Sequence, residues 1–252
     1  MGKKSFWFVA VASIGVSLGL APESSGNESR DSLLVSENFA GFLATHPDLL
    51  HYRLGVEAYR KDDFGDAMRH FRVASKFSDK PSQALVAEMY WQGVGVPADR
   101  ALAYAWMDLA AERGYPRMLV MRERYWDAMS AEEQERAIAV GQDIYGEFGD
   151  DIAKPRLETV LRRKMRTFAG SRTGYTGNTK IMGLMPGTMG AADDSKDATA
   201  PTLTLAAAEF YHPELWKPEF YYQWRQQQWE REFPAGAVDV GPLEPLKAEG
   251  RD

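Results

Sequence analysis

The chain contains no cysteine, and this absence removes several kinds of chemistry at once. Disulfide bonds, thiolate metal sites and a cysteine nucleophile are all excluded. A lipid-anchored lipoprotein is excluded as well, because its lipid is attached to a cysteine. The 252 residues are 44% hydrophobic, which is enough apolar material for one or two domains with a buried core.

Catalytic and metal-binding signals are also scarce. The chain has four histidines, and only His51 and His70 are expected to approach each other, without a third ligand at metal-binding spacing. Residues 15–19 match the G-x-S-x-G pattern of a hydrolase nucleophile, but they lie in an apolar run where no strand and helix can hold a serine. Residues 174–180 lack the glycine and hydroxyl positions of a phosphate-binding loop. We therefore expect no cofactor, no metal and no enzyme activity.

The most informative stretch is at residues 86–114, which read VAEMYWQGVGVPADRALAYAWMDLAAERG. Its hydrophobic residues recur every three or four positions in the second half, so they form one buried stripe on a helix. Asp99 is placed to cap this helix at its start, and Gly114 is placed to end it in a left-handed conformation. The signature positions of the stretch are Tyr90, Gly93, Gly95, Asp99, Ala103, Trp106, Ala110 and Gly114.

The same spacing recurs on both sides of this stretch, and the upstream copy begins at Leu54 and Gly55. Three positions of the central helix, Ala103, Met107 and Ala110, match three that lie thirty-six residues earlier: Ala67, Phe71 and Ala74. They also match three that lie thirty-four residues later: Ala137, Gly141 and Ile144. The later helix is expected to begin with a capping box made by Ser130 and Glu133. Recurrence at this period predicts a helical repeat array.

The central stretch resembles the Sel1-like repeat, a member of the tetratricopeptide repeat superfamily. The resemblance implies an all-α fold, a short right-handed α/α solenoid of about three helix pairs with a capping helix, which we place at residues 48–168. It also implies a surface that binds other proteins. Ala58 and Arg122 depart from the repeat pattern, which prefers a large aromatic residue and a glycine at those positions. The lack of cysteine excludes the secreted group of this family whose repeats are stapled by disulfides.

Residues 1–21 have the organisation of a secretory signal peptide, because Lys3 and Lys4 precede an apolar run at residues 6–20. An uncleaved membrane anchor is the alternative, although the run is short for a membrane span. Residues 22–47 are expected to form a polar segment and a leading helix. Removal of two lysines with the signal would change the net charge from -6 to -8, which disfavours nucleic acid as a partner. We expect an exported protein, either periplasmic or secreted.

A basic cluster follows the repeats at residues 154–168. Leu157, Leu161 and Met165 share one edge of a predicted helix, and basic residues occupy the rest of its surface. We expect this helix to cap the last repeat and to present its charged side to solvent, with contact to an anionic surface as the alternative. The basic residues are Arg162, Arg163, Lys164 and Arg166.

The remaining chain divides into a linker at residues 169–209 and an aromatic-rich segment at residues 210–252. The linker is rich in Gly, Ser and Thr, and its residues 173–182 are a candidate for a short hairpin. In the aromatic segment, Pro218 is placed to begin a helix and Pro234 to stop it. The aromatic residues fall on two faces of this helix: Phe220, Tyr221 and Trp224 on one, and Tyr222, Trp229 and Phe233 on the other. We expect one face to dock on the repeats, and the other either to be covered by flanking segments or to receive a partner protein or a sugar ring.

The sequence thus predicts an exported, non-enzymatic scaffold or adaptor that mediates protein–protein interactions in the bacterial cell envelope, with another envelope protein as its partner. The alternatives are a cell-wall or polysaccharide-binding protein that uses the C-terminal aromatic residues, and an envelope hydrolase. Binding is expected on the concave side of the solenoid, lined by the first helix of each pair, and on the tail. The candidate binding residues are Tyr52, Tyr59, Trp91, Tyr222 and Trp229.

Overall fold

The computed structural model describes residues 40–169, 180–184, 202–206 and 210–232. The expected signal peptide, Phe233 and Pro234 lie outside these residues. The first part of the described chain contains α2 (Ala40–Leu43), α3 (Pro47–Arg60), α4 (Phe64–Ser75), α5 (Lys80–Gln92), α6 (Arg100–Ala110), a 3-10 turn (Ala111–Arg113), α7 (Pro116–Asp127) and α8 (Ala131–Phe148). The second part contains α9 (Asp150–Ala169), β1 (Lys180–Leu184), β2 (Thr202–Ala206), α11 (Pro213–Trp216) and α12 (Pro218–Glu232).

Several helix ends are set by local sequence. The Asp99 carboxylate accepts a hydrogen bond from the backbone N–H of Leu102 at 3.0 Å, and α6 begins there. Ser130 and Glu133 form a reciprocal capping box at the start of α8. Gly114 follows the 3-10 turn with a φ of 75°, a left-handed conformation that glycine adopts without a steric penalty. The three predictions for these positions are confirmed.

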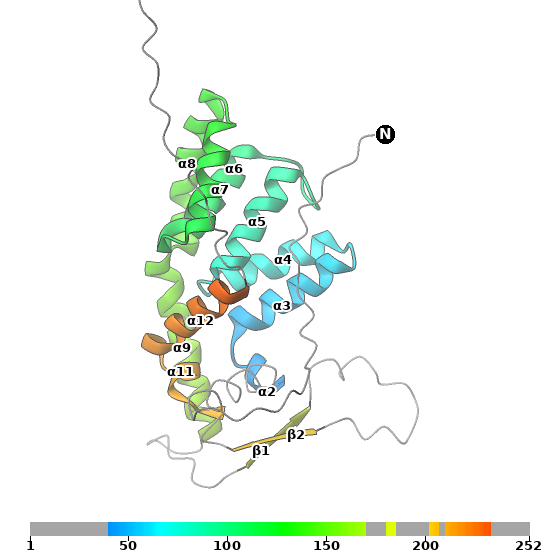
Figure 1. Cartoon of the computed structure of the whole chain (residues 1–252), viewed down its shortest axis with the longest axis vertical. Helices are drawn as coiled ribbons and strands as arrows, with labels where there is room; N and C mark the ends of the chain where they lie inside the picture. Colours follow the sequence, from blue (N-terminus) through cyan, green and yellow to red (C-terminus); the bar gives the residue numbers. More distant parts are fainter. Residues whose placement is uncertain (1–39, 170–179, 185–201, 207–209, 233–252) are drawn as a thin grey trace, which may run out of the picture.

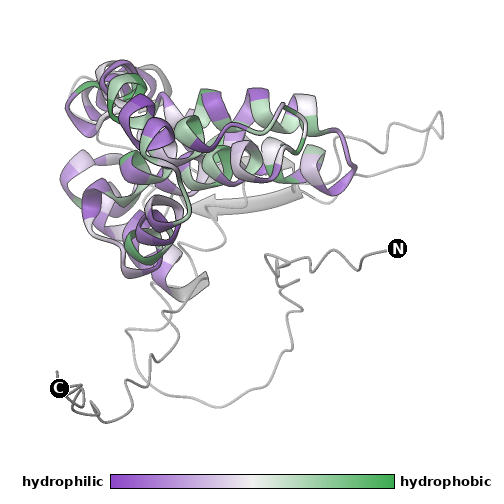
Figure 2. Ribbon diagram, turned by 90° about the horizontal axis from the view of Figure 1, so that it is seen from above, coloured by the Kyte–Doolittle hydropathy of each residue, from purple (hydrophilic) through white to green (hydrophobic). Residues whose placement is uncertain are grey.

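Successive helices pack side by side into an α/α solenoid, as the sequence predicts (Figure 1). The packed neighbours are α3 with α4, α4 with α5, α5 with α6, and α6 with α7. The third pair departs from this order because α8 packs against α6, where a Cβ added to Gly141 would lie 3.9 Å from the Ala105 side chain. Figure 2 shows hydrophobic and hydrophilic residues distributed around the same helices, as amphipathic packing requires.

The recurring small residues lie in the core that joins the repeats. Four signature alanines, Ala67, Ala74, Ala103 and Ala110, are fully buried, and Trp106 is 2% exposed beside them. Leu54 and Tyr90 are half-buried.

Three signature positions in the array require glycine. A Cβ added to Gly55 would lie 2.6 Å from the Phe71 ring, so glycine permits the close approach of α3 and α4. In the loop after α5, Gly93 has a φ of 69° and Gly95 has a φ of 71°, and a Cβ on Gly95 would meet Phe64 at 2.5 Å.

Helix α9 does not simply cap the last repeat, and this corrects the expectation from sequence. It leaves α8 and runs toward α2 and α11 (Figure 1). The expected apolar edge of Leu157, Leu161 and Met165 is present, but it packs in a second core with residues from the beginning and the end of the described chain. The physical reason is that aromatic residues of that end offer a large apolar surface against which this edge is buried. The buried members contributed by other elements are Phe42, Leu43, Leu49, Phe210, Leu215, Trp216, Tyr221 and Trp224.

The linker region contains a two-stranded antiparallel sheet. Strand β1 pairs with β2 in a register that joins Lys180 to Ala206 and Leu184 to Thr202. The expected hairpin within residues 173–182 is therefore wrong for its described part, residues 180–182, which pair with residues 204–206 instead. The alternating sequence of Thr202–Ala206 provides the β-branched residues that favour a strand. Residues 173–179 of that expected hairpin lie outside the described residues.

Within the described ranges, no helix has the length and apolar character that would let it span a membrane.

Candidate functional site

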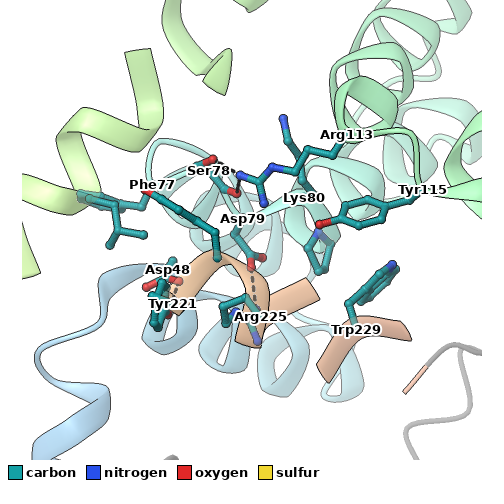
Figure 3. A pocket seen from close by; sticks show the side chains of 13 residues that line it. Asp48, Phe77, Ser78, Asp79, Lys80, Arg113, Tyr115, Tyr221, Arg225 and Trp229 are labelled. Atoms are coloured by element: carbon teal, nitrogen blue, oxygen red, sulfur yellow. Dashed lines mark hydrogen bonds and ion pairs between the residues drawn. The ribbon is translucent and has the colours of Figure 1, made fainter. Parts of the chain in front are cut away.

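Helix α12 lies across the starts of the first helices of the repeats (Figure 3). The Tyr221 hydroxyl donates to the Asp48 carboxylate at the start of α3, with an O–O distance of 2.6 Å. One helical turn later, the Arg225 guanidinium donates to the Asp79 carboxylate at the start of α5 over 2.8 Å. One further turn along, Trp229 lines the same small cavity as Tyr115, which precedes α7. Residues at intervals of four on α12 thus meet consecutive repeats.

The charged groups under α12 are largely buried, and Arg225 pairs with Asp79. Burial raises the pKa of Asp48 to about 6, although Arg225 and the Tyr221 hydroxyl both act to lower it. Burial acts to lower the pKa of Arg225, but the carboxylates of Asp79 and Asp48 keep it above its usual value. The cavity enclosed here is about 20 Å³, room for one water molecule and no larger ligand. This junction therefore holds the fold together and is not a substrate pocket.

A second buried charge cluster joins the repeats to α9. The Lys80 ammonium lies 2.6 Å from Glu112 and 3.1 Å from Asp150, and it also donates to the backbone carbonyl of Leu109. The Arg113 guanidinium pairs with Asp150 at 2.7 Å. Burial lowers the pKa of Lys80, although the neighbouring carboxylates oppose this. Because these charges are paired within the cluster, it has the character of a structural link between α5, the turn before α7, and α9.

The tail residues proposed for binding are largely engaged within the fold. Tyr222 donates to the backbone carbonyl of Lys154 at 3.2 Å, and the cations of Lys154 and Arg113 lie 5.2 and 5.5 Å from its ring centroid. Trp229 is half-buried against the repeat core. The two faces expected for α12 are only partly separated, because Tyr221 and Trp224 are buried while Phe220 remains 42% exposed.

Lys154 and Arg162 of α9 border a shallow groove between α9 and α12. The groove encloses about 460 Å³ and is lined by cations, carboxylates and one tyrosine: Lys154, Arg162, Glu158, Glu219, Tyr222 and Pro218. Arg162 is exposed and pairs with Glu158 at 3.6 Å. Arg163 and Arg166 are exposed, and Lys164 is half-buried. The lining has both signs of charge, so the groove itself shows no preference for anions.

The candidate residues in the repeats share a half-exposed surface on α3 and α5. Tyr52 lies against Phe71 with ring centroids 6.5 Å apart, and Tyr59 meets Phe64 edge-on at 5.1 Å. Both tyrosines are half-buried against the repeat core, and so is Trp91. Their surroundings include further half-exposed apolar side chains of the first helices: Val56, Ala84, Leu85, Leu119 and Met121.

Glu88 connects this surface across two repeats, and sequence reasoning missed it. Its Oε2 accepts a hydrogen bond from the buried Tyr125 hydroxyl of α7 at 2.5 Å. The Tyr125 ring stacks on Trp91 with centroids 4.0 Å apart and an angle of 5° between the planes. Glu88 lies three residues before Trp91, so helical spacing places the two side chains next to each other. This spacing is the sequence signal that could have identified Glu88 as part of the surface.

The approach of His51 and His70 is confirmed, and it joins α3 to α4. Their Nδ1 atoms lie 2.9 Å apart and their ring centroids 5.1 Å apart, so one ring donates a hydrogen bond to the other. Burial lowers the pKa of both side chains. Such an arrangement is a hydrogen bond between two neutral rings. Among the residues described, no group of three or more His, Cys, Asp or Glu side chains could hold a metal.

Comparisons with known proteins add a distant structural similarity. No protein-family model matches the sequence, and no curated protein matches it. A crystal structure of a protective antigen present in uropathogenic Escherichia coli strains, which displays an SLR (Sel1-like repeat) fold, is similar with a TM-score of 0.39 and 20% identity. The match covers 46% of this chain and 26% of that chain, so this chain spans about a quarter of its length. The helix packing described above, rather than this similarity, establishes the solenoid.

Proposed function

We propose that this chain is an exported, non-enzymatic scaffold that binds another protein of the bacterial cell envelope through the side formed by α3, α5 and α7. The observation that carries the proposal is the meeting of half-exposed aromatic and apolar side chains from these consecutive first helices. Tyr59 lies on α3, Glu88 and Trp91 lie on α5, and Tyr125 of α7 hydrogen-bonds to Glu88. Aromatic residues are enriched at the centre of protein interfaces.

The role of the tail in this proposal is structural. Tyr221 and Trp224 are buried, and the Tyr222 ring lies beside two cations. A polysaccharide-binding tail would need aromatic rings with an open face, as stacking on a sugar requires. The contacts made by α12 therefore favour a protein partner on the repeats over a sugar on the tail.

Export is supported by the sequence alone, through Lys3, Lys4 and the apolar run at residues 6–20. Cell fractionation followed by immunoblotting tests it. The full-length protein should be recovered outside the cytoplasm, and a variant lacking residues 1–21 should remain inside. Equal distribution of the two forms would refute export.

The binding surface is tested by affinity capture from an envelope extract with three purified forms: wild type, Tyr59→Ser and Phe220→Ser. Phe220 is the matched control because it is an exposed aromatic residue on α12, which is not one of the helices of the proposed interface. A partner retained by wild type and Phe220→Ser but lost by Tyr59→Ser supports the proposal, provided that circular dichroism shows equal helix content. Retention by Tyr59→Ser at the wild-type level would place binding elsewhere.

A further inference from the structure

The Glu88 carboxylate is held in place by neutral donors and has no cation of its own. Its Oε2 accepts from the Tyr125 hydroxyl at 2.5 Å, and its Oε1 accepts from the Gln92 side-chain amide. Within the part of the chain that the structure describes, no ion pair joins Glu88 to a lysine, arginine or histidine. The side chain is half-buried on α5, so its charge is fixed in position and only partly hydrated.

Other carboxylates of the same region differ in this respect. Glu57 on α3 pairs with Lys61 at 2.8 Å, and Asp99 at the start of α6 pairs with Arg136 at 2.5 Å. Glu88 thus lacks the counter-charge that these two carboxylates have.

Aromatic rings surround this carboxylate. Burial raises the pKa of the Tyr59 hydroxyl, and the nearby Glu88 charge raises it further. Tyr125 and Trp91 stack on each other beside it. The Trp91 ring already attracts one cation, the Arg100 guanidinium, whose Cζ lies 5.3 Å from the ring centroid. Because Tyr125 covers one face of Trp91 and Arg100 lies over the ring as well, an added cation would be attracted by the Glu88 charge itself.

We propose that Glu88 receives the side-chain cation of a lysine or arginine from the partner protein, with the half-buried Tyr59 beside the aliphatic part of that side chain. This inference rests on the proposed function and specifies the chemistry of its partner. A lysine or arginine stem is apolar and its end is charged, which matches apolar walls around one carboxylate. An acidic or purely apolar partner residue would leave Glu88 without its counter-charge.

The test uses three acetylated and amidated tripeptides as probes: Leu-Lys-Leu, Leu-norleucine-Leu and Leu-Glu-Leu. Binding is followed by NMR through the indole N–H signal of Trp91. The lysine peptide should shift this signal in a saturable manner that weakens with added salt, whereas the other two should shift it little. Equal shifts with the norleucine peptide would overturn the inference.

The matched variants are Glu88→Gln and Glu57→Gln. Glutamine at position 88 removes the charge and keeps an oxygen that accepts from Tyr125, while the Gln92 amide can turn its own oxygen toward the new NH2 group. Affinity for the lysine peptide should fall about tenfold in Glu88→Gln and stay unchanged in Glu57→Gln. Unchanged affinity in Glu88→Gln would also overturn the inference.

The two proposals fail in different ways. If a captured partner is lost by Tyr59→Ser but retained in full by Glu88→Gln, the surface is correct and the cation inference is wrong. If the lysine peptide binds at Glu88 but Tyr59→Ser retains the partner, the carboxylate binds cations and the proposed interface lies elsewhere.

Discussion

Replacement of Arg225 by methionine should destabilise the protein strongly, because the guanidinium is the cation under α12. Its side chain is 15% exposed, and its partner Asp79 is 2% exposed. Methionine fills much of the same volume, so the main loss is the charge and its hydrogen bond. Asp79 would remain buried without its cation, and Asp48 would lose a favourable neighbour.

Removal of one partner of a buried ion pair costs about 3–5 kcal/mol. Ordinary domains are stable by about 5–15 kcal/mol, so Arg225→Met should remove a large part of the unfolding free energy. For a chain of this size the loss corresponds to a decrease in Tm of about 6–20 °C. Urea unfolding followed by tryptophan fluorescence is a suitable assay, since Trp216 and Trp224 lie in the second core and Trp224 belongs to α12.

The control is Arg162→Met on α9, whose arginine is 62% exposed and pairs with Glu158 at 3.6 Å. This change should cost less than about 1 kcal/mol. The double variant Asp79→Asn with Arg225→Met should recover part of the loss, because no buried carboxylate would then lack its cation. Equal stability of Arg225→Met and Arg162→Met would refute the view that α12 is held by buried charge.

The remaining predictions concern pH, close packing and capping. Burial lowers the pKa of His46 to about 4, so the stability that the neutral ring contributes is lost as the pH falls from 6.5 towards 4. Burial raises the pKa of Asp48 from 3.8 to about 6, so protonation of this carboxyl adds stability as the pH falls through 6. Compared with wild type, His46→Phe should therefore lose less unfolding free energy between pH 7 and pH 4.5, and Asp48→Asn should lose more. An equal loss in wild type and both variants would contradict this. Gly55→Ala should lower the unfolding free energy by about 1–3 kcal/mol because its Cβ would meet the Phe71 ring at 2.6 Å, while Gly146→Ala, which meets nothing within 4 Å in α8, should raise it by about 0.5–1 kcal/mol. Chemical denaturation measures both unfolding free energies. A lower unfolding free energy in Gly146→Ala as well would contradict the expectation that alanine stabilises a helix where its Cβ has room. Ser130→Ala should cost about 0.5–2 kcal/mol by removing the capping box of α8, as measured by thermal unfolding, and an unchanged Tm would mean that the cap is dispensable.

The repeat core could be predicted from sequence because it depends on local spacing. Ala67, Ala103 and Ala137 recur at repeat intervals, and all three are buried. Capping by Asp99 and Ser130 was also predictable, since each cap involves residues three positions apart.

The position of the C-terminal elements could not be predicted in the same way. Arg225 and Asp79 are 146 positions apart, and Tyr221 and Asp48 are 173 apart. Helical periodicity shows which side of a helix is apolar, but it does not show which other segment covers that side. The apolar edge of α9 was therefore recognised, whereas its packing against Phe210 was not.

The candidate site was only half predictable for a related reason. The aromatic character of Tyr59 and Trp91 marked them as surface candidates. Glu88 resembled many other helical carboxylates in the sequence, and only the three-dimensional contacts show that it hydrogen-bonds to Tyr125 while lacking a cation.

The crossing of α12 over three repeats has a mechanical consequence. Each unit of a solenoid contacts mainly its neighbours, so small rotations between units accumulate into a variable curvature. Here Tyr221 is bonded to the start of α3, Arg225 is bonded to the start of α5, and Trp229 lies beside Tyr115 before α7, which couples those rotations. The side formed by α3, α5 and α7 should then be preorganised, and a partner would bind it without the entropic cost of ordering a flexible array.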